Sequence, residues 1–557
     1  MNQNLKRFLS ITVLFLSSTA LVIASSGCDD CPTTCAKGQN LYQPHAFSAS
    51  ASRDIMLEIA AWFPQPDEEG WHGAFGVGFD YMHTFNNNSC SSNEDTSAGC
   101  CTTLGSLPFW ASNNSNKMSI GGNASGDDLD AYQLGLGPVT TQGSVQLNPI
   151  VFQAGADFLL YVGAHKTERG FFLKAHGPVG VTSIDPNLTY SDTITAVAYP
   201  RGILNDTAAT VAAPYENIAQ AFAGGKSAGT FLKPMVFGLI SCKRTSSAQF
   251  GDPEFAVGYN LFADEKKHFG AAVTFSAPTG NKAEGVYVFE PIFGRNGHWG
   301  AGGEIIAHWK FWESDSSDDK WAQVFFDGKV YHLFKSKYTR SFDLKNNGAG
   351  SKYLLLAKYT SLSPTTANFQ NEILNAVNIT TVGVQSTFAA EGNFALGFDF
   401  HWKNWSLQIG YEGWGRTCES LVLDCTCPGS TNYSDYAVLG RQAPFSSADG
   451  TSVTNLCQPT AKIGESLARV NAATTGIVSA VVTANRLPET AEDALDVDGQ
   501  RARAVYTSKP WAELRYTWMD SDYVPFLAIT GGAEIPNSHK NEAAKMWNVG
   551  VNGGIAF

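Results

Sequence analysis

The final stretch of the chain, Trp547 to Phe557, constrains the fold more than any other segment. Large apolar side chains stand at nearly every second position, and small or polar ones stand between them. Because successive side chains of a strand point to opposite faces, this pattern predicts a strand with one apolar face and one small, polar face. The chain then ends on an aromatic residue. A soluble protein gains little from such an end, whereas a closed barrel in lipid needs its last strand to pair with its first.

The same two-residue period recurs along the chain. Clear runs cover 75–81, 255–261, 269–275, 299–311, 394–402, 405–411 and 514–518. Weaker runs fall at 144–163, 169–183, 284–293, 321–336, 351–360, 378–390 and 523–533. Phe, Trp and Tyr dominate the apolar faces, and the opposite faces mix Gly and Ala with charged residues, as in barrels with lipid outside and water inside. We therefore predict an all-β, transmembrane antiparallel barrel of about sixteen strands, with fourteen as the next most favoured number.

Composition agrees with this fold class. Only 16% of the 557 residues are charged, while 54 are glycine and 12% are aromatic, and no apolar run of spanning length follows residue 24. Strands of a membrane barrel are only half apolar, so low charge without apolar helices suits them. A Gly-rich secreted β-sandwich is the alternative that composition leaves open. The formal net charge of −13 argues against nucleic acid as a partner.

The N-terminus has the features of a secretory signal. Lys6 and Arg7 precede an apolar core from Phe8 to Ile23, and small residues stand before Gly27. We assign 1–26 to the signal, 27–53 to a Cys-bearing segment that is either periplasmic or a plug, and 54–557 to the barrel. Lipid attachment at Cys28 is the alternative to simple cleavage.

Turn lengths predict the orientation. The turns at Lys403-Asn404 and at Asp520 to Asp522 are short and should face the periplasm, because bacterial barrels carry their long loops outside. Segments 86–130, 184–234 and 415–500 are then the external loops. Two segments within these loops, 214–223 and 463–484, have helical character. Whether they fold back into the lumen or decorate the surface is left open.

Seven of the eleven cysteines lie in two predicted loops, three lie near the N-terminus and Cys242 stands apart. An exported chain meets an oxidising compartment, so disulfides within loops are expected. The candidates are Cys90, Cys100, Cys101, Cys418, Cys425, Cys427 and Cys457. The spacing of Cys28, Cys31 and Cys35 lacks a fourth ligand nearby, so we predict no metal there.

Ionisable residues on the non-apolar faces of the runs are candidates for the wall of a water-filled lumen. They are Asp80, Glu254, Glu304, His308, Lys310, Asp399, His401, Glu412, Glu513 and Arg515. Glu304 and His308 lie four apart, but in a strand they are two lumen residues and fall short of a zinc site. The sequence has no nucleophile elbow, HExxH helix or P-loop, so we predict neither an enzyme nor a cofactor.

The signal, the aromatic-faced strands and the terminal Phe557 resemble those of Gram-negative outer-membrane β-barrel porins. In that family a C-terminal aromatic, with apolar residues at alternate positions before it, is the address read by the barrel-assembly machinery. Phe557, Ile555, Val551 and Val549 match this motif, whereas Gly553 departs from it. The cysteine-bearing loops also resemble the major porins of chlamydia-like bacteria, in which disulfides stiffen the envelope.

The resemblance implies an outer-membrane porin of a Gram-negative bacterium, through which small hydrophilic solutes and ions diffuse passively. Two alternatives remain. One is a transporter of hydrophobic compounds with an N-terminal plug, and the other is a structural or adhesive surface barrel cross-linked by disulfides. The expected partners are outer-membrane lipid, the assembly machinery and the solutes, with self-association into a homo-oligomer left open.

Overall fold

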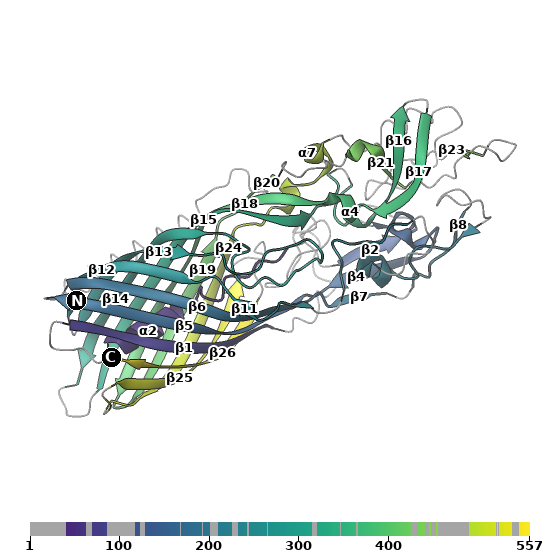
Figure 1. Cartoon of the computed structure of the whole chain (residues 1–557). Helices are drawn as coiled ribbons and strands as arrows, with labels where there is room; N and C mark the ends of the chain where they lie inside the picture. Colours follow the sequence, from purple (N-terminus) through teal and green to yellow (C-terminus); the bar gives the residue numbers. More distant parts are fainter. Residues whose placement is uncertain are drawn as a thin grey trace, which may run out of the picture.

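The computed structural model describes residues 41–62, 70–85, 117–122, 129–166, 169–191, 193–200, 210–224, 232–241, 244–264, 266–314, 320–345, 347–363, 366–424, 432–439, 445–446, 453–454, 490–519, 521, 523–536 and 545–557. Within them, twelve strands close into one antiparallel barrel (Figure 1). These are β1 (Gly70–Thr84), β5 (Ile150–Lys166), β6 (Arg169–Asp185), β12 (Glu254–Asp264), β13 (Lys267–Ser276), β14 (Gly300–Glu313), β15 (Lys320–Ser341), β18 (Thr381–Trp402), β19 (Trp405–Arg416), β24 (Val505–Thr517), β25 (Val524–Pro536) and β26 (Met546–Ala556).

The first and last barrel strands close the ring, as the alternation near the C-terminus predicts. β26 pairs with β1 from Ala74–Ala556 to Thr84–Met546. The backbone N–H of Phe557 donates to the carbonyl of Gly73 over 2.9 Å, and the N–H of Gly73 donates back over 2.7 Å. Pairing of β5 with β6 completes the circle, so the barrel sheet has no open edge between its twelve members.

The predicted strand number of sixteen, with fourteen next, is wrong. The candidate 378–390 begins in the short helix α4 (Val377–Thr380), and the rest of it lies with the candidate 394–402 in β18, a single strand of 22 residues. Register shifts in its pairing with β15, between Tyr331 and Ser336, interrupt the two-residue period. An irregularity within one strand therefore resembled a turn between two.

Two further candidates lie outside the barrel. Segment 351–360 begins with a 3-10 turn, η4 (Ser351–Tyr353), and continues as β16 (Leu355–Ser363). This strand forms a separate sheet with β17 (Thr366–Asn375) and β21 (Tyr436–Val438). Segment 284–293 is no strand: the Glu290 carboxylate accepts hydrogen bonds from the backbone N–H groups of residues 284–287, and Phe289 has a φ of 63°. A carboxylate satisfies these donors locally in place of a neighbouring strand.

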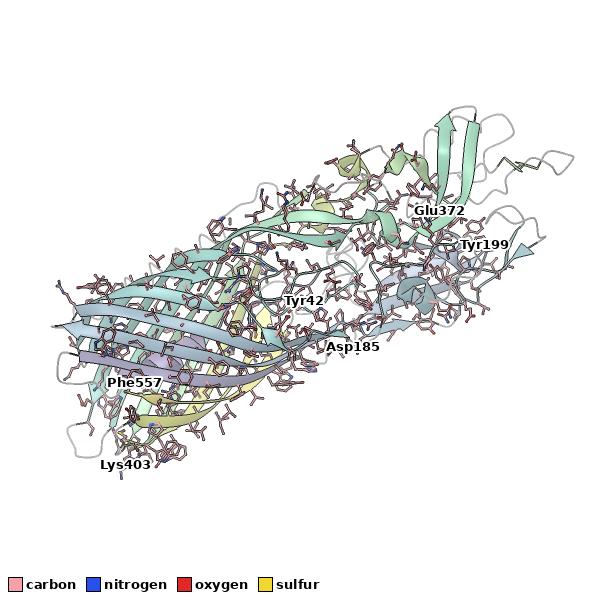
Figure 2. All side chains as sticks on the ribbon, viewed as in Figure 1. Tyr42, Asp185, Tyr199, Glu372, Lys403 and Phe557 are labelled. Atoms are coloured by element: carbon pink, nitrogen blue, oxygen red, sulfur yellow. The ribbon has the colours of Figure 1, made fainter. Side chains whose placement is uncertain are left out.

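The start of β1 and the end of β26, which pair with each other, lie at the short-turn end. Figure 2 shows Lys403 and Phe557 there, with Tyr199 and Glu372 at the opposite end. Connections at the first end are short, as between β18 and β19, where Lys403 adopts a φ of 56°. Connections at the other end are long and carry their own secondary structure (Figure 1).

We call these connections the outer extension. Its elements are β2 (Lys117–Gly121), β3 (Leu129–Asp130), η3 (Tyr132–Leu136), β4 (Gln142–Leu147), β7 (Leu188–Tyr190), β8 (Tyr199–Pro200), β9 (Thr210–Val211), α3 (Ile218–Ala223), β10 (Arg244–Thr245), β11 (Gln249–Phe250), η4, β16 (Leu355–Ser363), β17 (Thr366–Asn375), α4 (Val377–Thr380), β20 (Glu419–Leu423), η5 (Tyr433–Asp435), β21 (Tyr436–Val438), β22 (Phe445–Ser446), β23 (Val453–Thr454), α7 (Ala491–Ala494) and η6 (Asp498–Gln500). β10 and β11 pair with β6, and β20 pairs with β18, beside the ring of twelve.

The outer extension has its own apolar core. This core includes Leu129, Tyr132, Phe222, Tyr353 and Leu355. Helix α3 falls inside the predicted helical segment 214–223 and packs here, with the ring of Phe222 4.7 Å from that of Tyr353. The second predicted helix, 463–484, lies outside the described residues. So do the signal segment, Cys28 and all disulfide candidates except Cys418, which is buried between β19 and β20.

The outer face of the barrel is apolar. Alternate residues that point outward are exposed in every region of the ring, among them Phe79, Val257, Val273, Ile409 and Ile529. Aromatic side chains collect at the short-turn ends of the strands, where Trp71 is 75% exposed and Tyr523 is 64% exposed. No helix in the described part of the chain is long and apolar enough to cross a membrane.

Candidate functional site: the lumen and its internal helix

A helix of the same chain occupies the lumen. Helix α2 (Ala51–Trp62) precedes β1 and contacts β1, β5, β15, β18, β19 and β26, and all its residues except Ser52 are buried (Figure 1). Its sequence is rich in Ala, Leu, Met and Ile, which suit a buried helix. At its start, the Glu412 carboxylate accepts from the N–H of Ala51 over 3.2 Å and from the Ser52 hydroxyl over 2.7 Å. A carboxylate at this end also opposes the positive pole of the helix.

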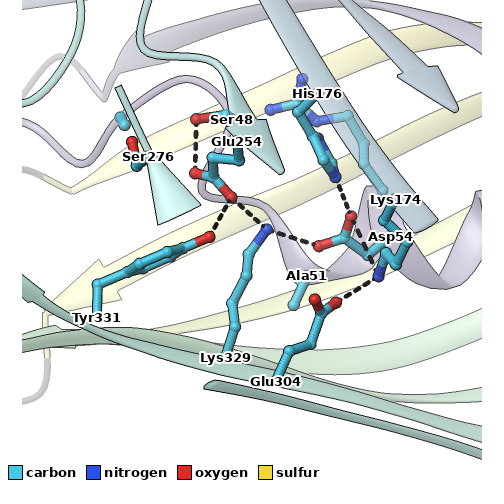
Figure 3. Close-up of polar contacts among 12 residues, drawn as sticks. Ser48, Ala51, Asp54, Lys174, His176, Glu254, Ser276, Glu304, Lys329 and Tyr331 are labelled. Atoms are coloured by element: carbon cyan, nitrogen blue, oxygen red, sulfur yellow. Dashed lines mark hydrogen bonds and ion pairs between the residues drawn. The ribbon is translucent and has the colours of Figure 1, made fainter. Parts of the chain in front are cut away.

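One lysine of the barrel wall gathers several carboxylates around the helix. The Lys174 ammonium on β6 lies 2.9 Å from Glu58 of α2 and 2.8 Å from Asp327. It also lies 2.5 Å from Glu304 and 3.8 Å from Asp54 (Figure 3). All five side chains are nearly inaccessible to solvent. Buried charges persist only when they are paired in this way. Lys174 therefore joins α2 to three strands of the wall.

A second lysine continues the network toward the long-loop end. The Lys329 ammonium lies 2.9 Å from Asp54 and 2.8 Å from Glu254. Glu254 also accepts from the hydroxyls of Tyr331 and Ser48 (Figure 3). It pairs with Arg295 at 2.8 Å. Ser48 belongs to the segment that leads into α2. The network therefore binds both the helix and its preceding residues to the wall.

The first turn of α2 is held from another direction. Arg53 lies 3.4 Å from Asp80 on β1 and 3.3 Å from Asp157 on β5. His176 on β6 bridges Asp157 and Asp54, at 3.2 Å and 2.6 Å. Removing one member of a buried ion pair typically costs about 3–5 kcal/mol, since the remaining charge stays buried. This side of the helix is thus anchored by interactions that are individually large.

Burial and neighbouring charges act in opposite directions on the two carboxylates of α2. For Asp54, burial raises the pKa, but Lys174, Lys329 and His176 outweigh it and hold the pKa well below its usual range. For Glu58, burial dominates over the attraction of Lys174 and raises the pKa to about 7. Glu58 shares Lys174 with three other carboxylates, and one ammonium does not neutralise four charges.

Asp54, Glu304 and Asp327 also have the spacing of a metal site, with carboxylate oxygens within 4.8 Å of one another. The Lys174 ammonium lies within 4 Å of all three. Lys329 pairs with Asp54 as well, so cations of the chain itself already stand beside these carboxylates, and the cluster is accounted for as a salt-bridge centre.

Aromatic and histidine rings close the lumen beside the last turn of α2. The Trp62 ring centroid lies 4.4 Å from that of His268, 4.9 Å from His72 and 5.5 Å from His308. These residues belong to β13, β1 and β14, near the short-turn end. The rings are tilted against one another and pack between the last turn of α2 and this part of the wall.

The opposite side of the lumen is built differently. β18, β19 and β24 present Asp399, Gln408, Ser406 and Arg515 toward the apolar residues Ile55 and Ile59 of α2. Gln323 donates to Asp399 over 2.8 Å, and Arg515 pairs with Glu513 at 2.9 Å. The helix contributes one backbone acceptor here, the Met56 carbonyl, to Arg515.

The ten predicted lumen residues share one location in the structure. Nine are buried on the inner face, and Lys310 is partly buried near the short-turn end. The structure brings Glu254 and Glu304 into the lysine network, and Asp80 against Arg53. Asp399, Glu513 and Arg515 lie on the other side, and Glu412 caps the helix. That they line a conducting pathway stays a prediction.

Several central residues were missed. Lys174, His176, Asp327 and Lys329 stand on the inner faces of the weaker runs 169–183 and 321–336, where strict alternation identifies them. Arg53, Asp54 and Glu58 lie on helix α2, which the two-residue period of strands does not reveal. The spacing of Ile55, Ile59 and Trp62 at three and four residues is the pattern that predicts this helix.

The fold and lumen define a class: closed antiparallel β-barrels with an apolar outer face, an ionisable inner face and an internal helix of the same chain. No family model and no curated protein matches the sequence. Solved structures with some likeness include an outer-membrane channel of Pseudomonas putida F1, with a TM-score of 0.32, 9% identity, and 88% of this chain and 99% of that one covered.

Two further structures extend the comparison. A mutant of the monoaromatic hydrocarbon channel TodX has a TM-score of 0.29 and 8% identity, with 94% and 97% of the two chains covered. The toluene transporter TbuX of Ralstonia pickettii has a TM-score of 0.27 and 10% identity, with 94% and 95% covered. At these scores the likenesses carry no argument about function, and none of the three supports the narrower resemblance to chlamydial porins.

Proposed function

We propose that this chain is an outer-membrane channel for small hydrophilic solutes, and that α2 closes its lumen in the conformation described here. The observation that carries the proposal is the division of side chains between the two faces of one closed sheet. Outward positions are aromatic or aliphatic, and inward positions hold buried charged and amide groups. Lipid outside and a polar pathway inside account for this division.

The height of the apolar face suits a membrane. Outward residues of β1 run from Trp71 to Tyr81, about ten residue steps, or about 33 Å along a strand. A strand tilt of about 40° reduces this to about 25 Å, the height of the apolar band of outer-membrane barrels. The aromatic residues at the short-turn ends, such as Trp402 and Trp405, then lie at the membrane–water boundary.

Placement in the outer membrane of a Gram-negative bacterium follows from the same architecture. Short turns face the periplasm in such barrels and long loops face outward, so the outer extension would lie at the cell surface. Val549, Val551, Ile555 and Phe557 remain the proposed signal for the assembly machinery. Three of them point outward from β26, and Phe557 follows directly after it.

The inner face favours polar solutes over apolar ones. A hydrophobic compound gains nothing from groups such as Asp399, Gln408 and Arg515, and has to strip them of their hydration. A small hydrophilic solute replaces that hydration with hydrogen bonds. Its passage requires α2 to shift within the lumen, because the helix and the wall are in contact around most of its circumference.

The second candidate is a transporter of hydrophobic compounds with an N-terminal plug. The feature that favours it is α2 itself, since a segment ahead of β1 does occupy the lumen. The polar wall opposes it. Among the described residues, the apolar clusters of the barrel interior consist mostly of contacts between α2 and the wall and form no continuous path.

Liposome swelling and planar-bilayer recording test the proposal. The purified full-length chain should show heat-modifiable migration in detergent gels, discrete conductance steps, and swelling of liposomes in small sugars. Uptake of a monoaromatic compound without sugar permeation would favour the second candidate. A protein that stays dispersed without detergent would overturn both.

A further inference from the structure

Helix α2 has two unlike faces, and the lumen wall differs between them. Arg53, Asp54 and Glu58 face β1, β5, β6, β14 and β15, where each finds an opposite charge. Ile55 and Ile59 pack with Trp511 of β24 and Ala395 of β18, and with Phe325 of β15 at the border between the two sides. The helix is therefore fixed on one side by ion pairs. On the other side it is held by apolar contacts and by hydrogen bonds that Glu412 and Arg515 form with its backbone and with Ser52.

On the apolar side, the wall keeps a polar group that the protein does not satisfy. Both amide atoms of Gln408 are buried without a hydrogen-bond partner among the described residues. Gln408 is 0% exposed. An unsatisfied buried amide is costly, so such groups are retained where they bind something. Asp399 and Gln408 stand directly opposite each other in the pairing of β18 with β19, which places their functional groups together.

A pocket opens on the same side. It lies between α2 and the wall near the short-turn end, and Ile59, His401, Ser406, Arg515, Thr517 and Phe526 contribute to its lining. In the described structure it is about as large as one water molecule. It leads from the last turn of α2 toward Ser406, two residues from Gln408 along β19.

The side chain of Trp511 separates this pocket and the polar residues Ser406 and Gln408 from the polar groups nearer the long-loop end. The Trp511 ring on β24 lies across Gly410 and Gly397 of the neighbouring strands, and a Cβ at Gly410 would lie 2.5 Å from it. A Cβ on Gly397 would lie 3.5 Å from Ile55, so helix and ring meet over the same glycine. Beyond the ring, toward the long-loop end, Lys509 pairs with Glu412 at 3.1 Å.

We infer that solutes pass between α2 and the wall of β18, β19 and β24, with Trp511 as the gate of that path. Asp399, Ser406 and Gln408 form the solute-binding row beneath the gate. Because the amide and hydroxyl both donate and accept hydrogen bonds, the row suits small uncharged solutes with hydroxyl or amide groups. This inference rests on the proposed function and names its route and solute class.

The barrel offers a matched control for the gate. On the ion-paired side, the Phe172 ring of β6 lies across Gly258 and Gly270 of β12 and β13, the same arrangement as Trp511 over its two glycines. Phe172 is 2% exposed and Trp511 is 5% exposed. Each alanine variant removes a buried aromatic ring from the inner face. The two variants should therefore differ in permeation only because the path lies on the side of Trp511.

The test compares Trp511→Ala and Phe172→Ala in the full-length chain, each first shown to retain heat-modifiable migration. Single-channel conductance and the rate of liposome swelling in a small polyol should rise at least about threefold for Trp511→Ala, because a constriction limits passage. For Phe172→Ala both should stay near the wild type. Trp511→Phe keeps an aromatic ring and should give an intermediate rise, and it replaces the alanine variant if that fails to fold.

Gln408→Leu tests the solute-binding row. Leucine has a similar volume without the amide, so it should slow polyol swelling at least about threefold while leaving conductance of small ions less affected. Equal rises for both alanine variants, or no rise for Trp511→Ala, would overturn the inference. A wild-type chain without any conductance or swelling would instead remove the proposed function itself.

Discussion

The two sides of the lumen differ in how their polar groups are satisfied. On the side of β1, β5, β6, β14 and β15, buried charges meet opposite charges from α2 and from each other, as Lys174 and Lys329 do. On the side of β18, β19 and β24, the Gln408 amide lacks a partner, and Ile55 and Ile59 give the helix an apolar surface. The comparison teaches that the charged side chains of a plug need pairing on only one side. The other side can then present polar groups to a solute.

The largest effect is expected from breaking the anchored side. Lys174→Met keeps much of the aliphatic length of Lys174 but leaves Glu58, Glu304, Asp327 and Asp54 without their shared cation. The folded state should lose about 3–5 kcal/mol, since buried carboxylates are left uncompensated. The measurement is the midpoint temperature of heat-modifiable migration, together with open probability in bilayers, which should rise as α2 loosens.

An outcome with unchanged midpoint and unchanged open probability would contradict the anchoring role of Lys174. Neutralising one carboxylate at the same time offers a rescue. Because Lys174→Met with Glu304→Gln removes both partners of the 2.5 Å pair, it should recover part of the loss.

The second-largest effect is the pH dependence of stability, and it also arises on the ion-paired side of the lumen. Burial raises the pKa of Glu58 from its ordinary 4.5 to about 7, so between these values the folded chain holds a proton that the unfolded chain has lost. The contribution of the Glu58 carboxyl to the free energy of unfolding is therefore largest below about pH 4.5. It declines as the pH rises toward 7, by up to about 3 kcal/mol. The midpoint temperature should therefore fall between about pH 5 and pH 6.5, a window that lies above the ordinary pKa of Asp54.

Glu58→Gln supplies the control for this pH dependence. Glutamine stays neutral at every pH, so the difference in midpoint temperature between the two pH values should shrink. A variant with the same pH slope as the wild type would show that Glu58 is already ionised in this range.

A smaller effect is expected on the unpaired side. Gln408→Leu removes two unsatisfied amide atoms and keeps the volume, so the folded state should be unchanged or gain about 1 kcal/mol. The same variant is expected to slow polyol permeation, and the two measurements together separate function from stability. A loss of several kcal/mol would mean that Gln408 has a structural partner, and the contrast between the two sides would then disappear.

The sequence predicts the barrel and the inner position of its charges, because both follow from the two-residue period of strands. Asp80, Glu254 and Glu513 were placed by this rule alone. The strand number was wrong, since an irregularity in β18 and a local carboxylate turn at Glu290 alter the period without marking a boundary. The pairing of Lys174 with four carboxylates could not be predicted, because it joins β6, β14, β15 and α2 across separations of 116 to 153 residues in the sequence.

The smallest effect serves as a reference for the anchored side. Lys267 and Asp264 form an ion pair at 3.4 Å at the turn between β12 and β13, with side chains 49% and 34% exposed. Water already solvates both charges, so Lys267→Ala should change stability by less than about 0.5 kcal/mol. The change in midpoint temperature of Lys267→Ala is compared with that of Lys174→Met. The comparison shows whether the stabilisation by Lys174 depends on its burial or on ion pairing alone. Comparable losses of stability for the two variants would contradict a dependence on burial. They would mean that water is excluded equally from the barrel rim and from the lumen.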